Sequence, residues 1–535
     1  MKISRRNFIQ ATTAVGAMTA LNSVAGPMMA KGEKPNVLFI AVDDLNDWLG
    51  CLKGHPQAKT PNLDRLLRSS TNFVNAHCPV PVCGPSRNAI LTGMRPSTTG
   101  WYSNRELGMK NLPEIAEQVL GDIPTLPQHF KNNGYHTMVV GKITHHGLYD
   151  YRKDEQWSEL APKWLMKGDD LKFLERGQGY GSYGENDHKY YPFPAEGSQT
   201  FPMFGKKGLS LCAGPLDRDD IANGGIMPDE MFAQWAVDKL KQDYDKPFFL
   251  GCGFVRPHVP YTAPREYFEM FPLDEIILPE YLENDMDDIP LYGKLMTHGF
   301  INGGDHAAVK AIGMKFQKEL IQGYLACVAF VDDQIGKVVN ALENSQYKDN
   351  TIVVLWGDHG QNLGEHTSWR KMTLWEESTR VPLAIRLPKQ VKGQETQQAV
   401  NLLDLYPTLT ELCGLPHVQS NEGISLKPLI NNPNFDRKFP SITTWGYKNH
   451  AVRDEQYRYI RYRDGSEELY DHKTDPHEHH NLANKLEYHQ VKVDLAKWIP
   501  QNQVLPTGMT DFNKGDWLEA TKARWEKEGV PEHLK

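Results

Sequence analysis

The sequence predicts an α/β fold, in which helices cover a large, mostly parallel central sheet and a smaller C-terminal subdomain holds an antiparallel sheet. Helical segments alternate with apolar strands at 125–145, 231–258 and 319–360, and such alternation places helices on both faces of a parallel sheet. Polar and histidine-bearing motifs follow these strands, where open α/β sheets bind their ligands. After residue 416 the pattern changes to short strands with a glycine turn, which is typical of antiparallel pairing.

The first predicted strand lies at 35–45, where PNVLFIAVDDL is a continuous apolar run that ends in two acids. The next segment, 60–78, predicts a helix with leucines on one face, followed by a short strand around Phe73. PSRNAILTGMRP at 85–96 predicts a helix that begins at its proline and ends at Gly93. The first strand and the first two helices are therefore expected before residue 100.

Three parts of the chain are expected: a signal peptide at 1–30, a main domain at 31–416 and a C-terminal subdomain at 417–535. Residues 150–230 and 270–310 break the helix–strand alternation and are rich in glycine, aromatic residues, aspartate and lysine. We expect these two segments to form long loops over the mouth of the site, where substrate specificity is usually decided.

The first thirty residues have the features of an export signal. Arg5 and Arg6 stand in SRRNFIQ, and a mildly apolar run of small residues follows them. This pattern resembles a twin-arginine signal. The alternative is a basic tail on a membrane anchor, but the apolar run is too short and too rich in threonine, glycine and alanine to span a bilayer well. We expect export to the periplasm, or secretion, through the twin-arginine machinery, and no stable membrane insertion.

The composition argues against nucleic acid as a partner. The chain has 535 residues and a formal net charge of −8, so there is no global basic excess to neutralise phosphates. Its seven cysteines form no CxxC pair and no regular spacing, which gives no sign of a zinc ribbon or a disulfide framework. Because seven is odd, at least one cysteine has no partner within the chain, and Cys83 in CPVPVCGPSR is the candidate. It could be a disulfide partner, a metal ligand, a thiol nucleophile or a modified residue.

Three acids stand at the ends of predicted strands. Asp43 and Asp44 follow the first strand, and Asp358 follows a later one. Adjacent carboxylates need a cation, because like charges packed together raise each other's pKa. A set of carboxylate oxygens suits a hard cation such as calcium or magnesium, so the sequence predicts a metal site.

Several positive or protonatable side chains would gather around this metal. They are Arg87, Lys142, His145, His258 and Lys371. A pocket with these groups suits a small tetrahedral oxyanion, either sulfate or phosphate.

The stretch CGPSRNAILTG resembles the signature of the type I, formylglycine-dependent sulfatases, which carry Cys-x-Pro-Ser-Arg before a helix that ends in Leu-Thr-Gly. The resemblance extends along most of the chain through NVLFIAVDDL, GYHTMVVGKITHHG, KPFFLGCGFVRPHVPY and GDHGQNLGEH, and it is greatest to the iduronate-2-sulfatase-like members of the family. It implies an alkaline-phosphatase-like sandwich fold, with the sulfatase catalytic domain at 31–416.

The resemblance also implies a metal site. The family's metal ligands match Asp43, Asp44, Cys83, Asp358 and His359. One calcium ion per chain is the implied cofactor, and Cys83 would complete its coordination after oxidation to Cα-formylglycine. A formylglycine-generating enzyme or an anaerobic sulfatase-maturating enzyme is the implied partner for that modification.

The family's catalytic residues can be carried over in the same way. They match Cys83 as the nucleophile, Arg87, Lys142, His145, His258 and Lys371. One hydroxyl of the aldehyde hydrate would attack sulfur while His258 protonates the leaving alcohol. His145 would then deprotonate the second hydroxyl, which expels sulfate. Arg370 stands next to Lys371 and is the other residue that could fill the lysine's role.

The expected function is hydrolysis of a sulfate ester on a carbohydrate. The substrate would be an oligosaccharide from a uronic-acid-containing or algal polysaccharide such as ulvan, or from a glycosaminoglycan, and Arg105 could bind a sugar carboxylate. One alternative is a phosphatase or phosphonate monoester hydrolase on the same fold. Another is a protein that binds sulfated glycans without catalysis.

Overall fold

The structure is a computed structural model. It describes residues 34–104, 112–145, 152–162, 201–202, 210–282, 284–298, 305–507 and 517–529. The predicted signal peptide and Arg105 lie outside the described residues.

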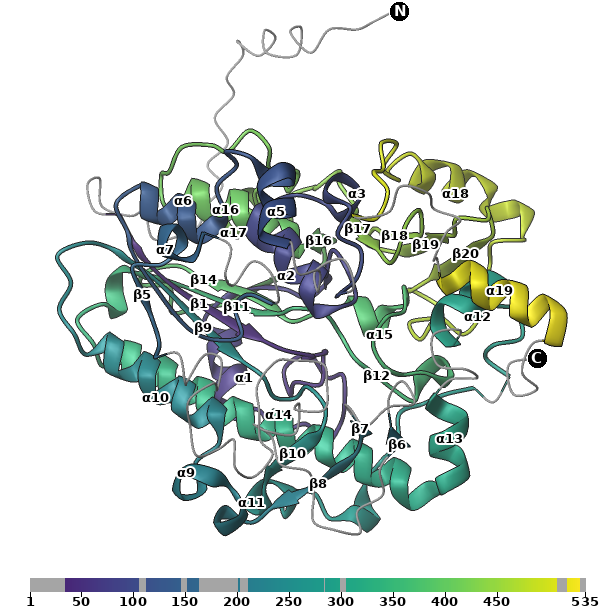
Figure 1. The fold of residues 1–535 in the computed structure, drawn as a ribbon, viewed down its shortest axis with the longest axis horizontal. Helices are drawn as coiled ribbons and strands as arrows, with labels where there is room; N and C mark the ends of the chain where they lie inside the picture. The colour runs from purple at the N-terminus through teal and green to yellow at the C-terminus, as the bar shows by residue number, and fades with distance from the viewer. Residues whose placement is uncertain are drawn as a thin grey trace, which may run out of the picture.

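An eight-stranded sheet forms the centre of the molecule (Figure 1). Its strands, in spatial order, are β15 (Gln394–Thr396), β2 (Thr71–Phe73), β14 (Leu383–Arg386), β11 (Thr351–Gly357), β1 (Asn36–Val42), β9 (Phe248–Phe254), β4 (His136–Gly141) and β5 (Glu159–Leu160). All neighbours are parallel except that β14 runs antiparallel to β11 and β2. The predicted large, mostly parallel sheet is confirmed. Strands β1, β9 and β11 are buried along their whole length, as their continuous apolar sequences require.

Helices cover both faces of this sheet. The long α14 (Met314–Glu343) packs with α10 (Pro228–Leu240) and α1 (Pro61–Arg68) on one face. The other face carries α2 (Cys83–Thr92), which packs against α6 (Leu126–Asn132) and α16 (Leu405–Leu412) (Figure 1). The leucines of α1 that the sequence placed on one face are all buried.

The remaining elements are short. The helices are α3 (Pro96–Thr99), α5 (Leu112–Leu120), α7 (Lys153–Gln156), α9 (Ala222–Gly225), α11 (Arg265–Phe268), α12 (Leu291–His298), α13 (Asp305–Ile312), α15 (Glu376–Thr379), α17 (Lys427–Asn431), α18 (His489–Ala496) and α19 (Trp517–Glu528). The strand pairs are β3 (Ala76–His77) with β16 (Val400–Asn401), β6 (Phe201–Pro202) with β7 (Ser210–Leu211), β8 (Ala213–Leu216) with β10 (Tyr261–Pro264), and β12 (Asn362–Leu363) with β13 (Trp369–Arg370).

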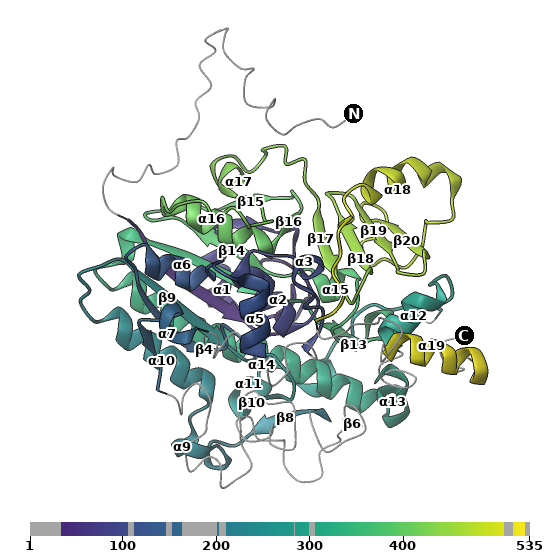
Figure 2. The same cartoon turned by 45° about the horizontal axis from the view of Figure 1, so that its top comes forward.

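A second sheet lies near the C-terminus, beside helix α18 (Figure 2). It is fully antiparallel and consists of β17 (Ser441–Thr444), β18 (His450–Arg453), β19 (Tyr457–Arg461) and β20 (Glu467–Asp471). The predicted C-terminal antiparallel sheet is confirmed. Its first strand contacts the segment that precedes α2, because the Thr443 hydroxyl donates to the Cys78 carbonyl at 2.6 Å and the Thr444 amide donates to the Pro79 carbonyl at 2.9 Å.

Helix α2 begins at Cys83, two residues before the start that its proline predicted. Val82 is extended and sets the boundary. Pro85 then lies within the first turn, where a backbone N–H has no partner inside the helix and its absence costs nothing. The predicted end is confirmed: Gly93 takes a φ of 71°, and a Cβ there would lie 2.0 Å from Oδ1 of Asn421.

All seven cysteines lie within the described ranges, and none of them forms a disulfide. The structure therefore removes the disulfide interpretation of Cys83. Among the described helices, none combines the length and the apolar character that crossing a bilayer requires.

The buried His450 makes the stability of the C-terminal sheet dependent on pH. Its Nε2 lies 3.0 Å from Gln503 Oε1 and its Nδ1 lies 3.0 Å from the Thr444 hydroxyl, a set of partners that suits a neutral ring. Burial, with Arg461 and Arg95 nearby, lowers the pKa of His450 to about 4.

Because the unfolded chain takes up this proton near pH 6.5, the stability from His450 is present above pH 6.5 and is lost as pH falls towards 4. The loss should reach about 3 kcal/mol. We expect the thermal midpoint of H450Q to change less than that of the wild type between pH 7 and pH 4.5. The exposed His489 offers the control: H489Q should keep the wild-type pH dependence, and an equal response of H450Q would contradict the assignment.

Candidate active site

Four predicted site residues stand at the ends of two neighbouring strands. Asp43 and Asp44 follow β1, and Asp358 and His359 follow β11. The two strands are parallel with Val42 beside Gly357, so both pairs leave the sheet at the same edge. Potential ligand atoms of Asp43, Asp358, His359 and Cys83 all lie within 4.8 Å of one another.

Asp44 is held in an unusual backbone conformation. Its φ is 61°, a left-handed conformation that costs energy for a residue with a side chain. Two groups hold it there. The Asp44 amide donates to Oδ1 of Asp358 at 3.1 Å, and the Tyr324 hydroxyl donates to the Asp44 carbonyl at 2.8 Å. The same hydroxyl accepts the amide of Asn46 at 3.0 Å, so Tyr324 on α14 fixes both sides of this turn.

Replacing Tyr324 by phenylalanine is expected to weaken metal binding by about tenfold, which is the cost of removing an outer-shell partner of a ligand. The fold should lose only about 1 kcal/mol. Calcium titration of purified Y324F by calorimetry measures the affinity. Tyr267 on α11 gives the matched control. Its hydroxyl donates to Asp333, at another position of α14, at 2.8 Å, and Y267F should bind calcium as the wild type does. An unchanged affinity in Y324F would show that the turn holds its shape without this hydroxyl.

Arg87 joins the two acidic strand ends. It lies on the first turns of α2 and its side chain is fully buried. Its Nε donates to Oδ2 of Asp358 at 2.8 Å, its Nη2 lies 3.3 Å from Oδ1 of Asp43, and its Nη1 donates to the carbonyl of Lys142. The neighbouring Ser86 hydroxyl donates to the Asp358 carbonyl at 2.6 Å. Helix α2 is thus fixed to Asp43 and Asp358, two of the predicted metal ligands, and Cys83 at its N-terminus is positioned with it.

Two lysines approach the carboxylates from other parts of the chain. Lys142 follows β4, and its ammonium donates to Oδ2 of Asp43. Lys371 follows β13, and its ammonium lies 2.5 Å from Oδ1 of Asp44. Although burial opposes it, the charge of Asp44 and its neighbours holds the pKa of Lys371 above its usual value. Lys371 therefore occupies the site, while the Arg370 side chain is fully buried in the adjoining structure.

Two histidines complete the set of predicted residues that the structure describes. His145 forms a hydrogen bond with Cys83. His258 places Nδ1 2.7 Å from the Val259 carbonyl, and it groups with Asp43 and Asp44 within 4.8 Å. Burial lowers the pKa of His258 to about 4, so its ring is neutral in this state.

Cys83 and Cys78 differ sharply although they are five residues apart and both are buried. Burial alone would raise the pKa of the Cys83 thiol, but Lys142, His145 and Lys371 hold it well below its usual value. Burial and Asp358 raise the pKa of Cys78 well above its usual value. The site therefore stabilises negative charge at the position of the Cys83 side chain, as a nucleophile requires.

The donor atoms fit a metal ion. Among the described residues, Asp44 Oδ2 and His359 Nε2 are buried and have no hydrogen-bond partner. The other ring nitrogen of His359 lies 2.9 Å from the Gly360 carbonyl, which directs Nε2 towards the carboxylates, 3.4 Å from Asp44 and 3.6 Å from Asp358. A ring fixed in this way is the usual arrangement of a histidine ligand.

The structure adds residues that the sequence reasoning missed. Asn104 accepts the Gly84 amide at 3.2 Å through Oδ1 and places Nδ2 3.9 Å from the Cys83 sulfur. Tyr324 and Ser86 hold the backbone of Asp44 and Asp358, as described above. No periodicity or motif marks Asn104 or Tyr324, because their contacts depend on the folded chain. The predicted sugar-binding residue Arg105 follows Asn104 directly but lies outside the described residues.

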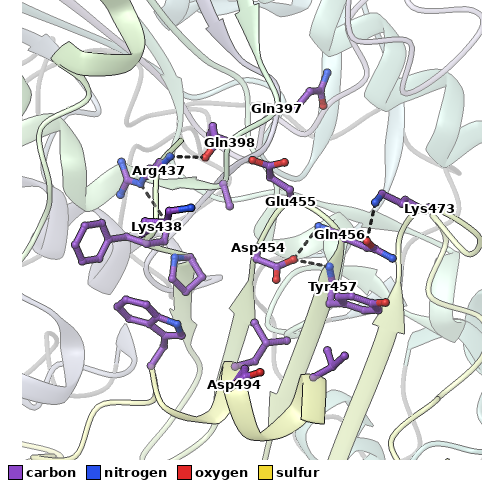
Figure 3. Close-up of a pocket in the computed structure, with 16 residues that line it drawn as sticks. Gln397, Gln398, Arg437, Lys438, Asp454, Glu455, Gln456, Tyr457, Lys473 and Asp494 are labelled. Atoms are coloured by element: carbon purple, nitrogen blue, oxygen red, sulfur yellow. Dashed lines mark hydrogen bonds between the residues drawn. The ribbon is translucent and has the colours of Figure 1, made fainter. Parts of the chain in front are cut away.

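A groove of about 690 Å³ lies elsewhere, between the main domain and the C-terminal sheet (Figure 3). It is lined by Gln397, Gln398, Ala399, Arg437, Lys438, Phe439, Pro440, Asp454, Glu455, Gln456, Tyr457, Lys473, Val491, Asp494, Leu495 and Trp498. Its cations have partners of their own: Arg437 contacts Asp404, Lys438 contacts Asp436, and Lys473 contacts Gln456. None of the predicted site residues lines this groove, and the cluster around Cys83 stays the candidate site.

Comparisons with known proteins match this chain along most of its length. The sulfatase family model matches residues 35–415, and a model of the C-terminal part of N-sulphoglucosamine sulphohydrolase matches residues 364–504. A sulfatase of Formosa agariphila is 39% identical over 92% of this chain and 91% of its own length. The iduronate 2-sulfatase of Mus musculus is 30% identical over 71% of this chain and 69% of its own length. The solved structure of a 2-O GAG sulfatase aligns with a TM-score of 0.62 at 22% identity, covering 92% of this chain and 94% of that one.

Proposed function

The chain belongs to the sulfatase family, and from this premise we propose that it removes sulfate from a sulfated carbohydrate, with formylglycine made from Cys83 as the nucleophile and a bound calcium ion. It is a sulfuric ester hydrolase, and it has the alkaline-phosphatase-like fold of that family, as the resemblance implied. The observation that carries the proposal is that Cys83, Asp43, Asp358 and His359 place ligand atoms within 4.8 Å of one another. The buried cations Arg87, Lys142 and Lys371 pair with the carboxylates of this site.

The metal would be held by Asp43, Asp44, Asp358 and His359, with the modified Cys83 as a further ligand. Carboxylate oxygens are the ligands that calcium prefers, and three of the four unmodified ligands supply them. When bound, the ion supplies positive charge for the sulfuryl oxygens and for the ionised nucleophile. In the structure the Cys83 thiol sulfur stands where the hydroxyl oxygens of the hydrated aldehyde would lie.

The protein's own side chains would carry the proton transfers and the charge stabilisation. Lys142 and Lys371 would hold the sulfate oxygens. Arg87 would fix the position of the nucleophile, because its contacts with Asp43 and Asp358 hold α2 in place. His145, which contacts Cys83, is placed to remove a proton from that side chain. His258 would donate a proton to the leaving oxygen, and an anionic substrate beside it would raise its low pKa.

The modification is tested by mass spectrometry of the tryptic peptide that ends at Arg87. We expect the aldehyde in protein that is produced together with a maturation enzyme. A peptide that carries only the unmodified thiol, in protein that hydrolyses sulfate esters at full rate, would overturn the formylglycine step.

The reaction class is tested with paired aryl esters. We expect the modified protein to hydrolyse an aryl sulfate much faster than the matching aryl phosphate or phosphonate. The reverse preference would favour the phosphatase or phosphonate monoester hydrolase alternative. A protein that hydrolyses neither ester but still binds sulfated glycans would favour the non-catalytic glycan-binding alternative.

We propose that the substrate is an oligosaccharide with a sulfated uronic acid or a neighbouring sulfated sugar, from ulvan, a related algal polysaccharide or a glycosaminoglycan. The similarity to an iduronate 2-sulfatase supports this substrate class. Arg105 remains the predicted ligand of the sugar carboxylate. A panel of defined sulfated oligosaccharides, with desulfation followed by chromatography, separates these sources. Equal rates on sulfated sugars with and without a carboxylate would contradict the uronic-acid preference.

We further propose that Cys83 is modified in the cytoplasm before the twin-arginine machinery exports the folded enzyme to the periplasm or the medium. The twin arginines at Arg5 and Arg6 support this route. A variant in which Arg5 and Arg6 are both replaced by lysine should stay in the cytoplasm with its aldehyde already formed. Normal export of that variant would contradict the route.

A further inference from the structure

A second group of buried titratable side chains lies away from the candidate active site. We call Asp285, His366, Glu377 and Glu478 the junction cluster. Asp285 precedes α12, His366 follows β12, Glu377 lies on α15, and Glu478 follows β20 of the C-terminal sheet. The cluster therefore joins three segments that are far apart in the sequence.

His366 stands at the centre of the junction cluster. Its Nδ1 lies 2.9 Å from Oδ2 of Asp285, and its Nε2 lies 3.8 Å from Oε2 of Glu377. Its ring stacks on Trp375 at 4.5 Å between centroids, which fixes the ring plane. Ligand atoms of His366, Glu377 and Glu478 all lie within 4.8 Å of one another.

Two polar atoms of this group are buried without a hydrogen-bond partner. Within the described part of the chain these are Nε2 of His366 and Oε2 of Glu377, whereas Nδ1 of His366 pairs with Asp285. The His366 and Asp285 side chains are each only 1% exposed. Native proteins rarely leave such atoms unsatisfied, so this group points to a ligand.

The carboxylates around the cluster differ in the cations they contact. Among the ion pairs of the described residues, Glu376 and Glu478 contact the guanidiniums of Arg453 and Arg458 and the ring of His472. Asp285 and Glu377 contact the His366 ring instead. Arg458 and His472 hold the pKa of Glu478 at about 2 against the effect of burial, so this carboxylate is ionised.

We propose that the junction cluster binds a second divalent cation, of the class that takes mixed imidazole and carboxylate ligands, such as Zn²⁺ or Mn²⁺. Nε2 of His366 and the carboxylates of Glu377 and Glu478 are its ligands. Asp285 supports the ring from the other side, in the carboxylate–histidine–metal arrangement that is common in metal sites.

Such an ion would fix the loop that carries Lys371. His366 and Glu377 stand on either side of Lys371 in the sequence, and Glu478 anchors both to the C-terminal sheet. The ion would thereby hold the Lys371 ammonium against Asp44. This consequence rests on the proposed role of Lys371, whereas metal binding at the junction cluster does not.

The test measures zinc binding to the complete chain with the catalytic site already filled by Ca²⁺. We expect wild-type protein to bind one equivalent of Zn²⁺ by calorimetry and elemental analysis. Its thermal midpoint should rise on the order of 3 °C with Zn²⁺. Co²⁺ in place of Zn²⁺ should give a visible d–d absorption band of the bound ion. Wild-type protein without a bound zinc equivalent would overturn the proposal and make His366 a protonated ion-pair partner only.

Two variants separate this site from the catalytic one. E377Q should bind Zn²⁺ at least tenfold more weakly and keep its calcium. D43N should lose calcium and keep the junction ion. Zinc binding that is weakened in D43N but unchanged in E377Q would overturn the proposal, because the zinc would then occupy the catalytic site. If E377Q does not fold, the stoichiometry and absorption band in wild-type protein still decide the matter.

Discussion

Replacing Cys83 by alanine is expected to lower kcat/KM for an aryl sulfate by at least about 10⁴-fold, because the variant has no side chain that can become the nucleophile. The fold should remain, since Cys83 stands at the N-terminus of a helix whose position is set by Arg87 and Ser86. The measurement is steady-state hydrolysis by calcium-loaded protein, with circular dichroism to verify the fold.

Cys78 provides the matched control for this prediction. It is also a buried cysteine of the same segment, but its raised pKa keeps it a neutral thiol. C78A should retain activity within a few-fold and lose some stability through the small cavity it leaves. Full activity in C83A would remove Cys83 from the chemistry. Equal inactivation of both variants would mean that the segment matters through its packing and not through the Cys83 nucleophile.

Replacing Asp43 by asparagine is expected to abolish calcium binding and to lower kcat/KM by at least about 10³-fold, since a major electrostatic group of the site is lost with the ion. Asp43 contacts both Arg87 and Lys142. The variant therefore also leaves two buried cations without their shared partner, and we expect it to lose about 3 kcal/mol of stability. Metal content, hydrolysis rates and denaturant unfolding measure the three effects.

Chelation distinguishes the metal from the carboxylate. Wild-type protein treated with a calcium chelator should lose activity to a similar extent and regain it when Ca²⁺ is added, whereas D43N should not respond to added Ca²⁺. Asp47, which pairs with the partly exposed Arg380, serves as a control, and D47N should keep its calcium. Wild-type protein that is free of metal and still fully active would contradict the metal assignment.

The sheet was predictable because its strands carry a clear signal. Runs such as Val37–Val42 are continuously apolar and can be satisfied only by burial on both faces. The direction of β14 was not predictable from its residues, because an apolar strand reads the same in either orientation. Its antiparallel pairing with β11 depends on the path that the chain takes through 358–382 after folding. The start of α2 was misplaced by two residues, since a proline is compatible with any position in the first turn.

The convergence of Asp43, Asp44, Asp358 and His359 was predictable from their place at strand ends, where parallel strands deliver them to one edge. Lys371 could be chosen over Arg370 only by resemblance, and the structure shows Lys371 beside Asp44. Tyr324 gave no signal at all, because a tyrosine inside a long apolar helix reads as a core residue. Its role arises from a contact with Asp44 across 280 positions of the chain, and such contacts exist only after folding.

The hydrogen bond from Thr443 to the Cys78 carbonyl has a consequence for timing during synthesis. Its two residues are 365 positions apart, and at translation rates of about 5 to 20 residues per second the ribosome needs roughly 20 to 70 s to make the intervening chain. Throughout that interval the segment before Cys83 lacks the strand that later holds it. Under the proposed modification, a maturation enzyme has this interval to reach Cys83 before the C-terminal sheet closes over the segment. The order of the two partners along the chain thus acts as a delay that keeps the substrate of that enzyme accessible.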